Sequence, residues 1–397
     1  MSDLTVNLCG VALKNPLILA SGPLSWGAAG VQAAFSAGAA AVVTKTIRPQ
    51  AVTNPVPHIA AAGRGCLLNT EGWSDLAAER WIERELPALA GRDGVLIAST
   101  GHTPAEVEEL AAPLAEAGAD LLELVSYRAE DAAPMVAAAK RGVTIPVLIK
   151  VSANWPDMLA VVDACLGAGA DGVTAVDSLG PALRVDVETG RPVLSAFAWL
   201  SGQAILPVAL RAVAQICLRH DVPVVGTGGV SRAPEVMEMV MAGATAVGVH
   251  SAPLLQGLSW FSKTLSRLER WLDEHSVLSS SRDEILMVRQ AHHGGLSGED
   301  ILRQAQDAFP SSSKDAFPSL ADLRGMALPH LREPPSHAPL DFVFDAESCN
   351  ACQRCVTVCA YAARHLLPGL RMSLDEAACR SCGLCATVCP TGALRAR

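Results

Sequence analysis

Eight of the twelve cysteines lie in two similar runs near the C-terminus. The runs are Cys349-x2-Cys352-x2-Cys355-x3-Cys359 and Cys379-x2-Cys382-x2-Cys385-x3-Cys389, the second followed by Pro390. This is the spacing of a bacterial-type ferredoxin that holds two [4Fe–4S] clusters, in which the fourth cysteine of each run ligates the other cluster. A zinc site is one alternative, although zinc takes four tetrahedral ligands and rarely uses this repeated spacing. Disulfides are the other alternative.

The spacing therefore assigns four cysteines to each cluster. One set is Cys349, Cys352, Cys355 and Cys389, and the other is Cys379, Cys382, Cys385 and Cys359. The first run departs from the usual pattern, because Ala360 stands where a proline often follows. Such clusters carry single electrons, so we expect the rest of the chain to hold a group that takes or splits electron pairs.

Composition limits the class of protein. The chain has 397 residues, of which 50% are hydrophobic but only 4% aromatic, so Ala, Val, Leu and Ile must build the core. A net charge of −9 gives no support to nucleic-acid binding. No apolar run reaches 18 residues and no signal peptide is evident, so we expect no membrane span. The other four cysteines are scattered in apolar sequence and read as core residues, which suits the reducing cytoplasm.

The first 275 residues alternate short apolar runs with helical stretches. Near-continuous apolar runs are typical of parallel strands covered by helices. The eight runs are Leu17–Ser21, Ala40–Lys45, Val95–Thr100, Leu121–Ser126, Val147–Ser152, Gly172–Ser178, Val224–Gly229 and Ala246–Ser251. An Ala-Gly-Ala step precedes four of them, and its glycine can end a helix in the left-handed conformation.

Eight such units in about 250 residues predict an α/β fold, a (β/α)8 TIM barrel over residues 1–275. A doubly wound sheet is the alternative, but no Gly-x-Gly-x-x-Gly loop follows the first strand. Residues 276–339 are rich in serine and proline and read as a linker with one or two short helices. Its His292-His293 pair could bind metal, although solvated histidines are the simpler interpretation. A small α+β ferredoxin-like domain follows over residues 340–397.

Barrel active sites lie at the C-terminal ends of the strands. Two predicted strands end in Lys45 and Lys150, and lysines facing one barrel mouth are unfavourable unless they meet an anion. Gly228 and Gly229 follow the seventh strand and Ser251 follows the eighth, where backbone N–H groups commonly hold a phosphate. Flavin mononucleotide (FMN) has one phosphate and converts hydride transfer into single electrons, so it would satisfy these features.

Several segments resemble the dihydroorotate dehydrogenase family, and especially the flavin-and-cluster part of dihydropyrimidine dehydrogenase. The matching segments include Asn15–Gly22, Val42–Lys45, Thr53–Pro57, Leu68-Asn69, Val147–Lys150, Leu200–Ile205, Gly226–Gly229 and Ala242–Ala252. The resemblance covers the barrel in order, and it implies an FMN-binding barrel followed by a two-cluster ferredoxin domain.

The resemblance also implies roles for individual residues. Lys150 would lie at the N1 and O2 edge of the flavin and stabilise the anionic reduced ring, and Asn69 would bind both flavin and substrate. The other implied flavin contacts are Ala20, Ser21, Lys45, Asp177, Ser201, Gly202, Gly228, Gly229, His250 and Ser251, the last five lining the phosphate mostly through backbone N–H groups. His250 is unusual, because many relatives have a small residue there.

One departure from the family concerns the catalytic acid. The family has Glu-Leu-Asn-x-Ser-Cys-Pro-Asn at the end of the fourth strand, where Cys or Ser moves the proton, whereas this chain has Glu123-Leu-Val-Ser-Tyr-Arg-Ala129. An Asn-Thr pair after the sixth strand has also become Asp177-Ser178. Either Ser126 or Tyr127 replaces the acid, or the substrate is not a pyrimidine.

Three functions remain open. The first is a flavin- and cluster-dependent oxidoreductase that acts on a C–C double bond or its saturated form. The second is an electron-relay subunit whose chemistry occurs on a partner, and the third is a barrel that has lost flavin. The first implies a ferredoxin or an NAD(P)H-dependent flavoprotein subunit as partner, in a homo- or hetero-oligomer, because this sequence shows no dinucleotide-binding loop.

Overall fold

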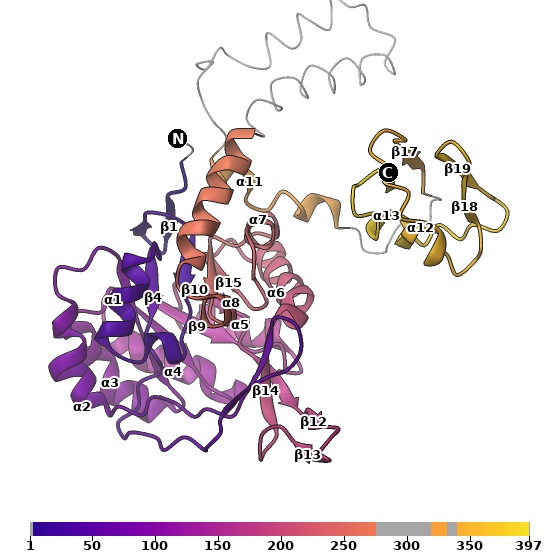
Figure 1. Cartoon of the computed structure of the whole chain (residues 1–397). Helices are drawn as coiled ribbons and strands as arrows, with labels where there is room; N and C mark the ends of the chain where they lie inside the picture. Colours follow the sequence, from indigo (N-terminus) through magenta and orange to yellow (C-terminus); the bar gives the residue numbers. More distant parts are fainter. Residues whose placement is uncertain (1–2, 275–318, 332–339, 397) are drawn as a thin grey trace, which may run out of the picture. The chain divides into compact units, whose positions relative to one another are not determined.

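The computed structural model describes residues 3–274, 319–331 and 340–396 (Figure 1). The chain forms two compact units, Met1–His330 and Leu331–Arg397. No helix of the described residues is long and apolar enough to cross a membrane. Most of the expected linker, including His292 and His293, lies outside the described residues.

The first unit is a closed parallel barrel, so the doubly wound alternative is wrong. The eight expected strands are all present. They are β3 (Leu17–Leu19), β4 (Ala41–Val43), β7 (Val95–Gly101), β8 (Leu121–Val125), β9 (Val147–Val151), β10 (Gly172–Ala175), β15 (Val224–Thr227) and β16 (Ala246–Val249). The barrel closes where β16 pairs with β3. The four Ala-Gly-Ala glycines all have positive φ, as predicted.

Helical segments follow each strand and cover the outside of the barrel (Figure 1). They are α1 (Ala28–Ser36), α2 (Ala78–Arg80) with η2 (Trp81–Glu85) and η3 (Pro87–Leu89), α3 (Pro104–Glu116), α4 (Ala129–Gly142), α5 (Met158–Gly167), α6 (Leu206–Arg219), α7 (Ala233–Met241), and α8 (Ser251–Gln256) with a helix at 260–274.

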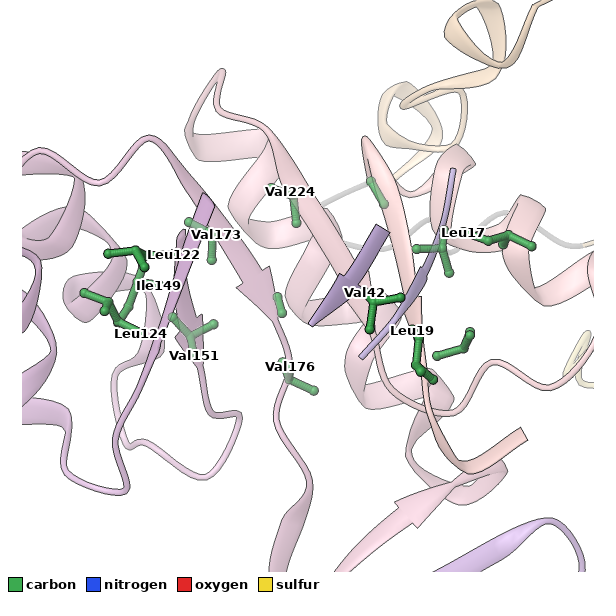
Figure 2. Close-up of a cluster of buried hydrophobic side chains, with 14 of the residues drawn as sticks. Leu17, Leu19, Val42, Leu122, Leu124, Ile149, Val151, Val173, Val176 and Val224 are labelled. Carbon is green, nitrogen blue, oxygen red and sulfur yellow. The ribbon is translucent and has the colours of Figure 1, made fainter. Parts of the chain in front are cut away.

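Alternate strand residues belong to two separate cores, because successive side chains point to opposite faces of a strand. Leu17 and Leu19 pack outward against the helices, together with Ile149 and others (Figure 2). Ile18, between Leu17 and Leu19, and Leu148, next to Ile149, instead pack inside the barrel. This alternation also fixes which polar residues can face the barrel interior, as the site below shows.

A hairpin closes the N-terminal end of the barrel. Its strands are β1 (Val6–Leu8) and β2 (Val11–Leu13), and Leu8 and Leu13 are buried among the interior residues at the starts of the barrel strands. Cys9, at the tip, donates a hydrogen bond to the Asp171 carbonyl just before β10. The N-terminal end is therefore filled by side chains, which leaves chemistry to the other end.

A second sheet lies in the loops that follow β4 and β10. Its order is β11 (Leu179–Ala182), β14 (Ala198–Gly202), β6 (Cys66–Asn69) and β5 (Ile59–Ala61), and a hairpin of β12 (Val185–Asp186) and β13 (Arg191–Pro192) extends from it. The sequence did not predict this sheet. Its antiparallel register sets Asn69 opposite Trp199 and Leu67 opposite Ser201, so it positions several site residues.

The described end of the expected linker packs on the barrel unit. Leu320 and Leu323 of α11 (Leu320–Leu323) are buried in the outer core. Arg324 donates hydrogen bonds to the carbonyls of Gly243 and Val222. The 3₁₀ turn η5 (Leu328–His330) follows.

The second unit is a small α+β domain built from two similar halves. Strand β17 (Phe342–Phe344) pairs with β20 (Leu394–Ala396), and β18 (Arg364–Leu367) pairs with β19 (Arg371–Leu374). A short helix lies within each cysteine run, α12 (Arg354–Thr357) in the first and α13 (Leu384–Thr387) in the second. The predicted fold class is thus confirmed for both units.

Candidate active site and cluster site

A cavity lies at the C-terminal ends of the barrel strands. It contains about 1060 Å³ of space free of atoms, part of it open to solvent. Its lining comes from the ends of the strands and from the second sheet.

The structure brings nearly all the predicted barrel residues to this cavity. Those that line it are Ala20, Ser21, Lys45, Asn69, Tyr127, Lys150, Asp177, Ser201, Gly202, Gly228, Gly229, His250 and Ser251.

Ser126 is the exception. It is buried outside the lining, where its hydroxyl donates to the His102 carbonyl at 3.1 Å and accepts from the Arg128 N–H at 3.1 Å. Because Ser126 stabilises the turn before α4, it is not available as the acid. Of the two candidates, only Tyr127 faces the cavity.

Lys150 and Glu123 form a buried ion pair inside the barrel. Their outward neighbours Ile149 and Leu122 belong to the outer core, so strand alternation turns Lys150 and Glu123 inward. The Lys150 Nζ lies 3.3 Å from Glu123 Oε1, and Thr174, which is opposite Lys150 in the β9–β10 register, donates to Glu123 Oε2 at 2.9 Å.

This pairing determines the charge of Lys150. Burial by itself lowers the pKa of the Lys150 ammonium, but the carboxylates of Glu123 and Asp177 outweigh burial and raise that pKa above its ordinary value. Lys150 is therefore a fixed positive charge at neutral pH.

Lys45 is also paired with a protein carboxylate. Its Nζ lies 2.6 Å from Glu71 Oε1, and both side chains are almost fully buried. The expectation that the two lysines need an anion was right, but Glu71 and Glu123 supply it. Glu71 follows β6 in the unpredicted sheet, so sequence reasoning about strand ends missed it.

Another part of the lining holds glycines and unused hydrogen-bonding groups. Gly202 and Gly229 have φ of 93° and 86°, and a Cβ on either would lie 2.1 Å from Gly65 O or 2.5 Å from Leu206 N, so close backbone packing requires glycine at both positions. Thr227 Oγ1 and His250 Nε2 are buried without a partner among the described residues. Ser251 Oγ donates to Ser201 Oγ at 2.9 Å. Buried polar atoms without a protein partner are groups that a bound polar ligand would satisfy.

His250 is a neutral side chain. Burial and the charges of Lys150 and Lys45 lower its pKa to about 4, although its bond to the Ala20 carbonyl acts in the opposite direction. Nδ1 lies 2.8 Å from that carbonyl and must donate to it, which leaves Nε2 as an acceptor. A neutral His250 cannot donate from Nε2 to a phosphate, so its side chain suits a hydroxyl or N–H donor instead.

Four rings form an aromatic wall at the cavity: Trp73, His102, Tyr127 and Trp199. Tyr127 stacks on Trp199 with centroids 5.2 Å apart and lies 4.8 Å from Trp73, which lies 5.3 Å from His102. Burial first and Asp177 second raise the pKa of Tyr127 to about 12. The sequence identified only Tyr127, because a tryptophan in a loop carries no spacing signal.

The cluster unit has a hollow of its own, with about 320 Å³ free of atoms, part of it open to solvent. The cysteines that line it are Cys359, Cys379, Cys382 and Cys385, the four that the spacing assigned together. Of the other set, Cys355 packs near Cys389. Among the described residues, no three His, Cys, Asp or Glu side chains are placed to hold a single metal ion. A four-iron cluster is larger than one ion, so the cysteines that hold it lie farther apart than the ligands of a single metal ion.

Backbone around the cysteines is arranged to face sulfur. Ala363 N–H and Leu394 N–H donate to Cys359 Sγ and Cys389 Sγ at 3.3 Å and 3.5 Å. Hydrogen bonds to sulfur are among the features that stabilise and tune clusters. The cysteines and amides present therefore fit four-iron clusters.

Two family models match the chain. The model described as dihydroorotate dehydrogenase covers residues 3–272, and the model described as 4Fe-4S binding domain covers residues 372–395.

Curated relatives agree with the first match. The dihydroorotate dehydrogenase B (NAD(+)) catalytic subunit of Methanothermobacter thermautotrophicus is 34% identical over 73% of this chain and 98% of the relative. Those of Pelobacter propionicus and Pyrococcus abyssi are each 33% identical, over 69% and 70% of this chain and 95% and 96% of theirs. These names do not include dihydropyrimidine dehydrogenase, so that finer resemblance is not tested by them. The chain belongs to the dihydroorotate dehydrogenase family, joined to a 4Fe-4S binding domain.

Proposed function

We propose that this chain is an FMN- and iron–sulfur-dependent oxidoreductase that acts on a carbon–carbon double bond, or its saturated form, in a small cyclic substrate. The observation that carries the proposal is the barrel-mouth cavity, whose lining joins a fixed Lys150 charge, glycine backbone and unpaired buried polar groups. The same chain holds a cysteine domain suited to single electrons.

The cofactor would be held from both sides of the cavity. Backbone N–H groups of Gly228 and Gly229, with the hydroxyls of Ser201 and Ser251, suit the phosphate. His250 Nε2 suits a hydroxyl donor of the ribityl chain. Ala20, Ser21, Lys45, Asn69, Asp177 and Gly202 complete the proposed contacts. When bound, FMN would exchange a hydride with a substrate carbon and pass electrons singly to the clusters.

Lys150 and Tyr127 have separate proposed roles. Lys150 offers a positive charge to the reduced, anionic ring, which stabilises charge where it develops. Tyr127 keeps its proton at neutral pH because its pKa is about 12, so it can donate that proton to the substrate but is a poor base. This favours reduction of an activated double bond over oxidation of its saturated form, with a dihydropyrimidine dehydrogenase-like chemistry as the nearest description.

A reductase of this kind needs an electron partner. The relatives are named as catalytic subunits, which supports a second subunit for this chain also. We propose a ferredoxin or an NAD(P)H-dependent flavoprotein that exchanges electrons through the cysteine domain. The electron-relay alternative is less favoured, because Asn69 and Tyr127 face the cavity where a relay alone would need neither.

The cofactor content tests the assignment. Protein purified without oxygen should release FMN rather than FAD and contain about eight irons and eight acid-labile sulfides per chain, from two clusters. Cys382→Ala should lose about half of the iron and keep FMN, because the flavin site is in the other unit. Zinc without labile sulfide, or a chain without flavin, would reject the proposal.

Substrate turnover tests the role of Tyr127. We expect negligible dihydroorotate oxidation and at best weak uracil or thymine reduction, because pyrimidine-binding amides are missing and such losses reduce specificity by orders of magnitude. Tyr127→Phe should slow turnover of the true substrate about 10²–10⁴-fold, while Ser126→Ala should have little effect.

The pH profile gives a second readout. Because the pKa of Tyr127 is about 12, the rate should show no loss from its ionisation between pH 6 and 10. Rapid turnover of dihydroorotate, or full activity in Tyr127→Phe, would show that the acid is elsewhere.

A further inference from the structure

The first inference concerns the aromatic wall of Trp73, His102, Tyr127 and Trp199. Its members come from four separate segments, after β6, β7 and β8 and on β14. Only 4% of residues in the chain are aromatic, and one of its two tyrosines lies here. Three of the four rings line the cavity directly. Such a gathering offers a substrate flat π faces.

The wall leaves three hydrogen-bond donors free for a ligand. Within the described part of the chain, neither indole N–H of Trp73 and Trp199 nor the Tyr127 hydroxyl has a hydrogen-bond partner, and Asn69 is a family amide retained on the lining. A ligand here would be recognised by stacking together with these few polar groups.

The charge of the lining disfavours an anionic substrate. Each lysine of the lining already has a carboxylate partner, Lys45 with Glu71 and Lys150 with Glu123. Asp177 also lines the cavity, and it has no ion-pair partner within 4 Å among the described residues, its Oδ1 accepting from the Ser178 N–H. A carboxylate on the substrate would meet this charge, whereas a cation over aromatic faces is attracted by them.

We propose that the substrate is a planar conjugated ring of neutral or positive charge that stacks on the aromatic wall. This proposal rests on the proposed function, of which it specifies the substrate class.

Four small probes of similar shape test charge and planarity separately. They are 1-methylnicotinamide (planar cation), nicotinamide (planar, neutral), nicotinate (planar anion) and nipecotamide (saturated ring, a cation at neutral pH and so the match to 1-methylnicotinamide). Binding is measured on the purified holoprotein by isothermal titration calorimetry, which depends neither on turnover nor on the absorption of the probe. Nicotinate and nipecotamide should bind at least about tenfold more weakly than the first two.

Variants connect the result to named residues. Trp199→Leu should weaken nicotinamide binding about tenfold, and Asp177→Asn should improve nicotinate binding. Phe197→Leu is the matched control, because Phe197 is 72% exposed, lies just before β14 and is not in the lining. Tightest binding of nicotinate, no preference for the planar ring, no binding of either favoured probe, or an unchanged Trp199→Leu would overturn the proposal. Flavin extraction tests the proposed function independently of these results.

A second inference concerns Arg364 in the cluster unit. Its side chain is 3% exposed, its guanidinium lies 4.5 Å above the Phe342 ring, and Nη2 lies 3.5 Å from Cys385 Sγ. Among the described residues it has no carboxylate within ion-pair distance, and its buried Nε has no partner. A buried cation requires an anion, and Arg364 lines the hollow of Cys359, Cys379, Cys382 and Cys385.

The two halves of the unit differ at this position. Arg364 comes five residues after Cys359 and begins β18, while Leu394 comes five residues after Cys389 and begins β20. Both side chains are buried. The two cluster sites thus have similar backbone structure, but one has a buried arginine where the other has a leucine.

We infer that Arg364 raises the reduction potential of the cluster held by Cys359, Cys379, Cys382 and Cys385 above that of the other cluster. A positive charge beside the thiolates favours the state with one more electron, and net charge and hydrogen bonds to sulfur are known determinants of cluster potential. The cluster with the higher reduction potential would be the one that is reduced first.

A redox titration of the anaerobic holoprotein, followed by electron paramagnetic resonance, tests this inference. Arg364→Leu should lower one midpoint potential by at least about 59 mV, which is a tenfold change in the equilibrium constant for one electron, and should shift the other midpoint potential less. Arg364→Lys should retain part of the effect, and Arg371→Leu, at an exposed position in β19, should have none. Cys382→Ala identifies which signal belongs to the affected cluster. Unchanged midpoints, or equal shifts of both, would overturn the inference, and iron content of each variant verifies that the clusters are intact.

Discussion

The buried pair of Lys150 and Glu123 constrains the rest of the barrel mouth. Strand alternation turns both side chains into the barrel interior, where an unpaired ammonium would be strongly unfavourable. Each therefore requires the other, and Thr174 satisfies the second oxygen of the carboxylate. Removing one partner of such a pair typically destabilises a protein by about 3–5 kcal/mol, because a buried charge is left uncompensated.

This pair fixes a positive charge in the lining of the cavity. The same lining holds glycines and unpaired polar groups. The second sheet adds Asn69, Trp199 and Ser201 in one antiparallel register. Chemistry, cofactor and substrate recognition can thus be supplied by separate parts of the lining. The proposed cofactor contacts and the proposed substrate contacts thus come largely from different elements.

The sequence was sufficient for the barrel and for the residues at its strand ends. Apolar runs, four of them preceded by a helix-ending glycine, located all eight strands, and side chains just after the strands necessarily meet at one end. Glu71, Trp73 and Trp199 could not be found this way, because they reach the cavity through a sheet formed by two long loops. Ser126 was misjudged because its hydroxyl serves a local turn, which its position after a strand does not reveal. The ion pair of Lys150 with Glu123 was available from strand alternation, but only once the strands were known to be neighbours.

The midpoint potential of the bound flavin in Lys150 and Glu123 variants tests the account most directly. Lys150→Met should lower the midpoint potential of the flavin by at least about 30 mV, because the reduced ring loses its positive neighbour. For two electrons this is a tenfold change in the equilibrium constant. Glu123→Gln should lower the potential as well, because buried Lys150 loses the carboxylate that keeps it charged, and Lys140→Met, on α4 and paired with Asp171, should leave it unchanged. A Lys150→Met protein that still binds FMN at the parent potential would contradict the account.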